Sequence, residues 1–198
     1  MFNIKIFKKL FVLGIIGSLF LLLLVFFLRQ ETYDLSLPGK LYVVNKKSCD
    51  LSIYDLENGK LLKTIPIPVE PHELVCVDNK YIVVTNYGNK KITGHELSVV
   101  DVRTDEIKMQ IPLGIDKPHD VTLVDDEGSL VATVSDESNE IVITDVENGN
   151  RLRNIFTEQN YSHLLATNND SIIFVSNMSS GSVSVINLRR SEEHTSEL

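Results

Sequence analysis

The chain has 198 residues, 43% of them hydrophobic, and a formal net charge of −8. This length allows one ordinary domain and an appendage. Residues 30–189 hold 24 acidic against 14 basic side chains, a net charge of −10, and such a surface repels phosphate backbones. Nucleic-acid binding is therefore not expected.

An uncharged apolar run near the amino terminus predicts a membrane anchor. Residues 10–28 would form a helix of roughly 28 Å, close to the bilayer core of about 30 Å. Three lysines precede the run, which predicts a cytoplasmic amino terminus, residues 1–9, and an extracytoplasmic remainder. A cleaved signal peptide is the alternative, but the run is long and no small-residue cleavage site follows it. We therefore predict a single-pass signal anchor in the cell membrane, followed by a linker over residues 29–40.

From Leu41 onward, one pattern of short apolar segments recurs with a period just over forty residues. Its equivalent positions are Asp55, Asp101, Asp145 and Asn187, at steps of 46, 44 and 42. Runs rich in Val, Ile and Tyr, bounded by Gly, Asn and Asp, predict strands, and the Asn-Gly pairs predict tight hairpins. We interpret the three aspartates as turn-forming rather than catalytic. Four strands in a repeat of this length are typical of a propeller blade.

The predicted fold is all-β: a partial β-propeller of about three and a half four-stranded blades after one transmembrane helix. Blade 1 covers about residues 41–69 and begins at its second strand, blade 2 about 70–115, blade 3 about 116–158, and blade 4 about 161–189, without its fourth strand. A ring closes with roughly four to eight blades, so a longer parent chain would supply the missing inner strand of blade 1. Residues 190–198, RSEEHTSEL, have no strand pattern and match the in-frame translation of a common sequencing-adapter oligonucleotide. We interpret them as a non-native tail.

Two motifs carry a family resemblance. VVTNYG at residues 83–88, and LSVVDVRTDEIKMQIPLGIDKPHDV shortly after it, resemble the YVTN-family β-propeller repeats of YncE-like and surface-layer-type propellers. The resemblance extends over residues 41 to about 189. It implies an extracytoplasmic propeller with several blades, usually seven. The third copy departs from the pattern, because Ser135 replaces the strand-end asparagine of the other copies (Asn45, Asn86 and Asn177).

Three histidines recur with the repeat. His72, His119 and His163 each begin a predicted inner strand, at steps of 47 and 44. In a propeller this position faces the mouth of the central channel, where a ring of imidazoles could hold a ligand or a metal. The interpretation we favour is structural: Pro-His takes part in the repeat's own hydrogen bonding between blades. No Glu or Asp stands at a fixed offset from all three, which weakens an enzymatic interpretation.

The second copy contains an insertion. Ten residues separate the strand-end Asn or Ser from the next repeated Asp or Asn in three copies, but fifteen do so in copy two. The extra residues lie within 86–96 and bring Lys90, Lys91 and His95. Insertions on a rigid repeat scaffold often determine binding specificity, so these are candidate ligand-binding residues. The interpretation we favour for the insertion itself is length drift without a function.

The two cysteines predict no disulfide. Cys49 lies in a polar loop, whereas Cys76 lies within the apolar segment ELVCV and is expected to be a small buried residue. Export would permit a bridge, but a loop residue and a core residue are poorly placed to form one.

No catalytic or cofactor motif is found, so we predict no catalytic residue and no cofactor. The predicted function is a membrane-anchored extracytoplasmic module that binds a protein, glycan or small-molecule ligand at the channel mouth. One alternative is a propeller enzyme or metalloprotein, lactonase-like or redox, that uses His72, His119 and His163. A structural surface-layer component is the weaker alternative.

Overall fold

The computed structural model describes residue 17 and residues 37–124, 128–157, 161–168, 172–189 and 192–197. Within these residues no helix is both long enough and apolar enough to cross a membrane. The predicted cytoplasmic segment and the predicted anchor, residues 10–28, lie outside the described residues except for Gly17. The described strands all belong to one compact unit, Pro38–Leu198.

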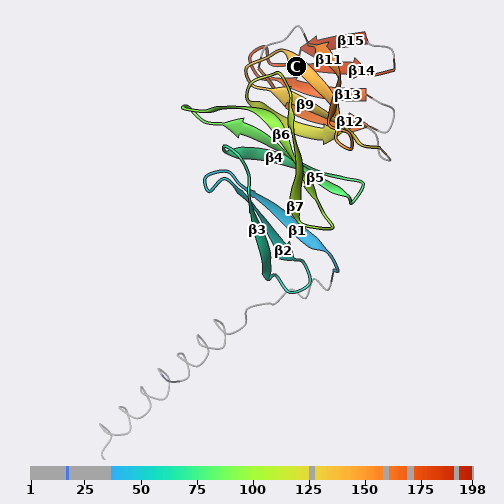
Figure 1. Ribbon diagram of the computed structural model, residues 1–198. Helices are drawn as coiled ribbons and strands as arrows, with labels where there is room; N and C mark the ends of the chain where they lie inside the picture. Colours follow the sequence, from blue (N-terminus) through green and yellow to red (C-terminus); the bar gives the residue numbers. More distant parts are fainter. Residues whose placement is uncertain are drawn as a thin grey trace, which may run out of the picture. The chain divides into compact units, whose positions relative to one another are not determined.

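The described residues form four antiparallel sheets, each built from consecutive strands (Figure 1). The first sheet contains β1 (Lys40–Asn45), β2 (Asp50–Asp55) and β3 (Leu61–Pro66). The second contains β4 (Pro71–Val77), β5 (Tyr81–Gly88), β6 (Thr93–Asp101) and β7 (Glu106–Pro112). The third contains β8 (Pro118–Leu123), β9 (Leu130–Ser135), β10 (Glu140–Asp145) and β11 (Asn150–Phe156). The fourth contains β12 (Ser162–Asn168), β13 (Ile172–Asn177), β14 (Ser182–Asn187) and β15 (Glu192–Glu197). The predicted all-β architecture of short antiparallel strands is confirmed.

The hydrophobic core lies between neighbouring sheets. Successive side chains of a strand point to opposite faces, so β5 directs Ile82 and Val84 toward the first sheet, where they share a cluster with Leu51. Val83, between them, joins Val131 of the third sheet in a second cluster. A third cluster joins the third and fourth sheets. Because β5 and β9 are covered on both faces, they are continuous apolar runs in the sequence.

The repeated aspartates form turns. The Oδ1 atoms of Asp55, Asp101 and Asp145 each accept the backbone N–H two residues further on, at 2.9, 2.8 and 3.0 Å. Gly59 and Gly149 complete two of these turns with φ angles of +69° and +73°, a region that favours glycine. The prediction that these aspartates are turn-forming is confirmed.

A side-chain hydrogen bond explains the strand-end asparagine and its exception. In three sheets this asparagine donates from Nδ2 to a serine Oγ on the next strand, at 2.8 to 2.9 Å: Asn45 to Ser52, Asn86 to Ser98 and Asn177 to Ser184. In the third sheet both partners differ, with Ser135 and Val142 at the two positions. Ser135 Oγ instead accepts the backbone N–H groups of Glu137 and Ser138. The third copy therefore departs from the motif at both positions of the hydrogen bond, and Ser135 forms hydrogen bonds with the following turn instead.

The prediction that Cys76 is buried is wrong. Its side chain is exposed on β4, and Cys49 and Cys76 are both free thiols. Cys76 lines a cavity of about 500 Å³ together with Leu41 and Tyr42 of β1. Among the described strands β1 pairs with β2 alone, so the first sheet has no strand that covers this part of β4. The apolar residues around Cys76 therefore lie on a face of β4 that the first sheet does not cover.

The prediction that residues 190–198 contain no strand is wrong for residues 192–197. β15 pairs antiparallel with β14, from Ser182 opposite Glu197 to Asn187 opposite Glu192. The edge of β14 presents backbone N–H and C=O groups, which any extended segment can satisfy with its own backbone. A side-chain pattern is therefore not needed for pairing at this position. The adapter origin of residues 190–198 stays a prediction.

Candidate functional site

The three repeated histidines lie at equivalent irregularities in the sheets. His72, His119 and His163 are the second residues of β4, β8 and β12. In all three sheets the ladder between this inner strand and its neighbour shifts register at the histidine. Such a bulge removes residues from the ladder and redirects their side chains.

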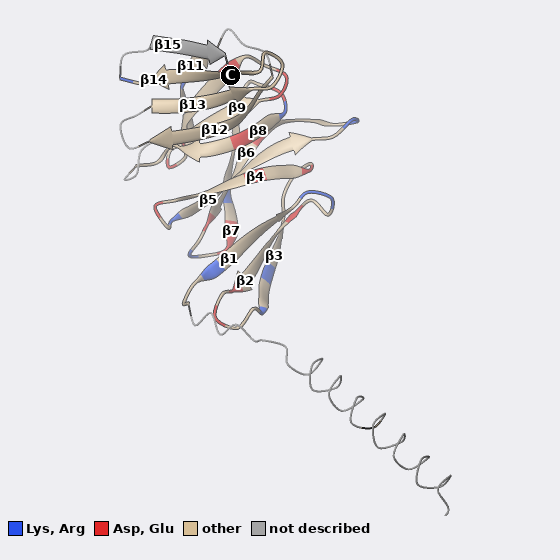
Figure 2. Ribbon diagram, turned by 180° about the vertical axis from the view of Figure 1, so that it is seen from behind, with Lys and Arg blue, Asp and Glu red and all other residues tan. Residues whose placement is uncertain are grey.

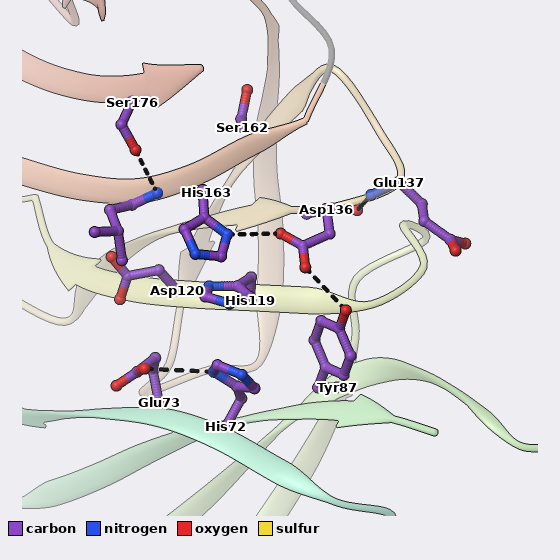
Figure 3. A network of polar contacts seen from close by, with 12 residues as sticks. His72, Glu73, Tyr87, His119, Asp120, Asp136, Glu137, Ser162, His163 and Ser176 are labelled. Carbon is purple, nitrogen blue, oxygen red and sulfur yellow. Dashed lines mark hydrogen bonds and ion pairs between the residues drawn. The ribbon is translucent and has the colours of Figure 1, made fainter. Parts of the chain in front are cut away.

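The structure brings the three imidazoles together. Figure 3 shows the rings one above another across three sheets. The ring centroids of His72 and His119 are 4.0 Å apart, and those of His119 and His163 are 3.8 Å apart. His119 lies in the middle and is 5% exposed. These three residues are called the histidine cluster below.

Side-chain hydroxyl groups on β5 and β13, the second strands of their sheets, form hydrogen bonds that stabilise two of these bulges. Thr85 Oγ1 accepts the backbone N–H of Glu73 at 2.9 Å and donates to the carbonyl oxygen of His119 at 3.0 Å. Ser176 Oγ, at the same repeat position, accepts the N–H of Leu164 at 3.0 Å. Thr85 thus joins the second sheet to the third. Of the two Pro-His segments, Pro118-His119 takes part in hydrogen bonding between sheets, through the carbonyl oxygen of His119.

The third sheet uses a carboxylate for this purpose. Val134 occupies the position of Thr85 and has no hydroxyl. Asp120 Oδ2 accepts the N–H of Leu165 in β12 at 2.8 Å, and its Oδ1 accepts the N–H of Val121 at 2.8 Å. Burial raises the pKa of Asp120, and the two N–H groups oppose that rise. Asp120 is therefore explained by contacts between the third and fourth sheets.

Two residues that the sequence analysis missed complete the cluster. Asp136 is 6% exposed, and its Oδ2 accepts a hydrogen bond from the Tyr87 hydroxyl at 2.9 Å. Its Oδ1 lies 3.1 Å from His163 Nδ1 (Figure 3). The Tyr87 ring is 5.1 Å from His72 and 5.8 Å from His119, centroid to centroid. Burial raises the pKa of Tyr87 and the hydrogen bond to Asp136 raises it further, so the phenol remains a donor.

A shared repeat position explains how these residues meet. Lys46, Tyr87 and Asp136 each follow directly after a strand-end Asn or Ser. Lys46 Nζ lies 4.5 Å from the centroid of the Tyr87 ring, and Tyr87 in turn bonds to Asp136. A cation, an aromatic ring and a carboxylate therefore follow one another across the first three sheets. Aligning the repeat copies at the strand-end Asn or Ser places these three residues at one position. The position does not stand out in the sequence, because its three side chains differ in chemical type.

Two imidazole nitrogens of the cluster are buried without a hydrogen-bond partner. These are Nδ1 of His72 and Nδ1 of His119, although His72 Nδ1 lies 3.3 Å from Glu73 Oε1 in poor geometry. Burial lowers the pKa of His72, and Lys46 lowers it further. Burial also lowers the pKa of His119, against the opposing influence of Asp136. Both rings are therefore neutral at neutral pH, and each then has one ring nitrogen that can accept a hydrogen bond.

The lowered pKa values predict that acid destabilises the fold. In the unfolded chain both rings take up a proton near their ordinary pKa of about 6.5, and in the folded chain they do so at lower pH. The unfolded state then binds more protons over this range. The free energy of unfolding is therefore expected to fall as the pH decreases from about 7 to about 5. Urea unfolding of the full chain at a series of pH values measures this slope.

Two variants separate the cluster from other titrating groups. His119→Gln should flatten the slope between these pH values, whereas His95→Gln, which changes an exposed ring, should retain the wild-type slope. A wild-type stability that stays constant or rises toward pH 5 would contradict the prediction.

Three members of the site can converge on a metal ion. One ligand atom each from His119, Asp136 and His163 lies within 4.8 Å of the other two. Imidazole nitrogen and carboxylate oxygen are ligands that zinc and related transition metals accept. The set differs from the predicted one, because Asp136 takes the place of His72.

The predicted insertion residues divide into two groups. Lys90 and Lys91 are exposed at the tip of the β5–β6 hairpin, and they line a cavity of about 670 Å³ together with Tyr87. His95 is also exposed, with Nδ1 3.4 Å from the carbonyl oxygen of Thr93. It belongs neither to the cavity lining nor to the histidine cluster. The structure therefore connects the two lysines, but not His95, to the site.

Comparison with known proteins identifies the fold. Neither protein-family models nor curated proteins give a match. Among solved structures, hydrazine synthase of Kuenenia stuttgartiensis superposes with a TM-score of 0.66 at 18% identity, over 85% of this chain and 52% of that one. Virginiamycin B lyase from Staphylococcus aureus gives 0.68 at 13% identity, over 81% and 52%. The WD40 repeats of RRP9 give 0.66 at 12% identity, over 80% and 47%.

The fold is that of a β-propeller. WD40 repeats form propeller blades of four-stranded sheets, and the sheets of this chain superpose on such an array. Each sheet is therefore one blade, and β1, β4, β8 and β12 lie innermost among the described strands of their blades. The chain spans about half the length of the solved structures it matches.

Proposed function

We propose that this chain is a membrane-anchored, extracytoplasmic β-propeller module of the YVTN-repeat type, which binds a ligand at the mouth of its channel. The observation that carries the proposal is the convergence of the histidine cluster with Tyr87 and Asp136. These side chains come from three blades and meet where the inner strands begin.

The unpaired nitrogens support binding at this place. A buried polar atom without a partner costs roughly 1–3 kcal/mol, and His72 Nδ1 and His119 Nδ1 both lack one. A ligand that hydrogen-bonds to them would offset this cost. Tyr87, which contacts both rings, also lines the 670 Å³ cavity, so a ligand there would lie beside the cluster.

The membrane topology can be tested with the native thiol at Cys76. Residues 10–28 and the three lysines before them support the anchor and its orientation. In intact cells that express a Cys49→Ser variant, a membrane-impermeant maleimide should label the exposed Cys76. A variant that lacks both cysteines is the control. Labelling only after the cells are permeabilised would contradict the extracytoplasmic assignment.

Imidazole resonances can test binding at the mouth. The full chain, purified in mild detergent and labelled at histidine, is titrated with trehalose, tetra-alanine, pyrophosphate, citrate and Zn²⁺. We expect at least one of these probes to shift the signals of His72, His119 and His163 while His95 stays unchanged. If none of the five probes moves the three signals, or if His95 moves alone, the proposed binding site is wrong.

A metalloprotein is the second candidate, favoured by the convergent atoms of His119, Asp136 and His163. Calorimetry with Zn²⁺ should then show binding that weakens by at least about tenfold in Asp136→Asn, because even loss of a residue that only hydrogen-bonds to a metal ligand typically costs about 10–100-fold in affinity. His95→Ala is the matched control and should bind Zn²⁺ as the wild type does. Equal affinities for Asp136→Asn and His95→Ala would rule out this metal site.

A further inference from the structure

The cavity beside the histidine cluster has a charge opposite to that of the chain. Five lysines and one glutamate line it: Lys46, Lys47, Lys90, Lys91, Lys117 and Glu70. They come from the β1–β2 turn, the β5–β6 hairpin and the segments before β4 and β8. Figure 2 shows blue ribbon at the tips of the turn and the hairpin, which lie on one side of the molecule. The local charge of this cavity is positive, whereas the chain as a whole has a net charge of −8. We call it the lysine cavity.

Three of these ammonium groups are not neutralised. Lys47 lies 3.8 Å from Glu70, and Lys117 pairs with Glu137. Lys46, Lys90 and Lys91 have no carboxylate within ion-pair distance in the described part of the chain. Like charges held around one cavity repel each other, so an anion placed among them would be attracted.

Part of the lysine cavity is held in place by other contacts. Lys46 is half-buried and sits over the Tyr87 ring, which Asp136 fixes by a hydrogen bond. On the hairpin, Asn89 Oδ1 accepts the backbone N–H of Lys91 at 2.8 Å. The positions from which the lysines extend are therefore set before any ligand arrives, which lowers the entropic cost of binding.

We propose that the lysine cavity binds an anionic ligand through phosphate or carboxylate groups that contact Lys46, Lys90 and Lys91. Its volume of about 670 Å³ suits a small molecule. Tyr87 lines the cavity and contacts the rings of His72 and His119, so a ligand bound in the cavity would lie beside the histidine cluster. This inference rests on the proposed function and names the chemical class of its ligand.

Calorimetry with pyrophosphate and with citrate tests the inference on the full chain in detergent at low salt. The Lys90→Ala, Lys91→Ala double variant should bind the preferred anion at least about tenfold more weakly, as expected for losing hydrogen bonds to charged groups. The control is the Lys60→Ala, Lys63→Ala double variant, which removes the same charge from exposed residues outside the cavity and should bind as the wild type does. Stronger binding of pyrophosphate would indicate a phosphate ligand, and stronger binding of citrate a carboxylate.

The outcomes separate this inference from the proposed function. Equal affinity for the two double variants, or no binding of either anion, overturns the anion inference. If trehalose or tetra-alanine then still shifts the signals of the histidine cluster, the proposed binding at the mouth stands without it. Lysine-dependent binding of an anion that leaves those signals unchanged would keep the lysine cavity as a binding site and remove its link to the cluster.

Discussion

Replacing Thr85 with valine is expected to lower the free energy of unfolding by about 1–3 kcal/mol, the cost of leaving buried polar groups without partners. Thr85 is fully buried, and its hydroxyl serves both the N–H of Glu73 and the carbonyl oxygen of His119. Valine has nearly the same shape but can make neither bond. Urea unfolding of the full chain measures the change. Because the bulge at His72 loses its support, the imidazole resonances of His72 and His119 should shift as well.

Thr133→Val is the matched control. Thr133 is also fully buried, but its hydroxyl has no hydrogen-bond partner. Valine there removes an unsatisfied group without removing a bond, so stability should be unchanged or higher. If the two substitutions destabilised the chain equally, the hydrogen bonds of Thr85 between the second and third blades would not be the cause.

Replacing Gly94 with alanine is expected to damage both the β5–β6 hairpin and the lysine cavity. A Cβ at Gly94 would collide with the backbone of Asn86 and Tyr87, which cannot move as a flexible side chain would. Overpacking of this kind costs about 1–3 kcal/mol. Because the hairpin carries Lys90 and Lys91, pyrophosphate affinity should also fall at least about tenfold. Urea unfolding and calorimetry measure the two effects.

Gly59→Ala is the control for this substitution. Gly59 has a φ of +69° and open space around its Cβ position, so alanine there strains a turn without a collision. It should cost about 1 kcal/mol and leave anion affinity unchanged, because Gly59 lies in the β2–β3 turn, outside the cavity lining. A Gly94→Ala variant with wild-type stability and affinity would show that the hairpin tolerates the collision.

The strands and turns could be predicted because their local sequence signals recur in the copies of the repeat. Alternating Val and Ile give the strands, and Asp55 or Asp145 before an Asn-Gly pair gives the turn. The meeting of His72 with its two equivalents also followed from the spacing, since equivalent positions of stacked blades lie side by side. Local chemistry and periodicity carry this information.

Features that depend on a neighbouring blade could not be predicted in the same way. Cys76 lies in an apolar segment, but its exposure is decided by whether the first sheet has a strand inside β1. Asp136 and Tyr87 were missed because a lone acid and a lone aromatic residue have no motif of their own. Their pairing exists only once two blades are placed together. The same holds for Lys46, whose role depends on the ring that it covers.

The pairing of β15 with β14 through backbone groups has a practical consequence. If the outermost position of the fourth blade accepts a strand for its extended backbone alone, then its amino acids can be exchanged freely, provided that the segment has the right length. Residues 192–197 would then be a suitable place to graft a foreign epitope or an affinity tag. Such a graft would be displayed at the rim of the blade, three strands away from β12 and its histidine.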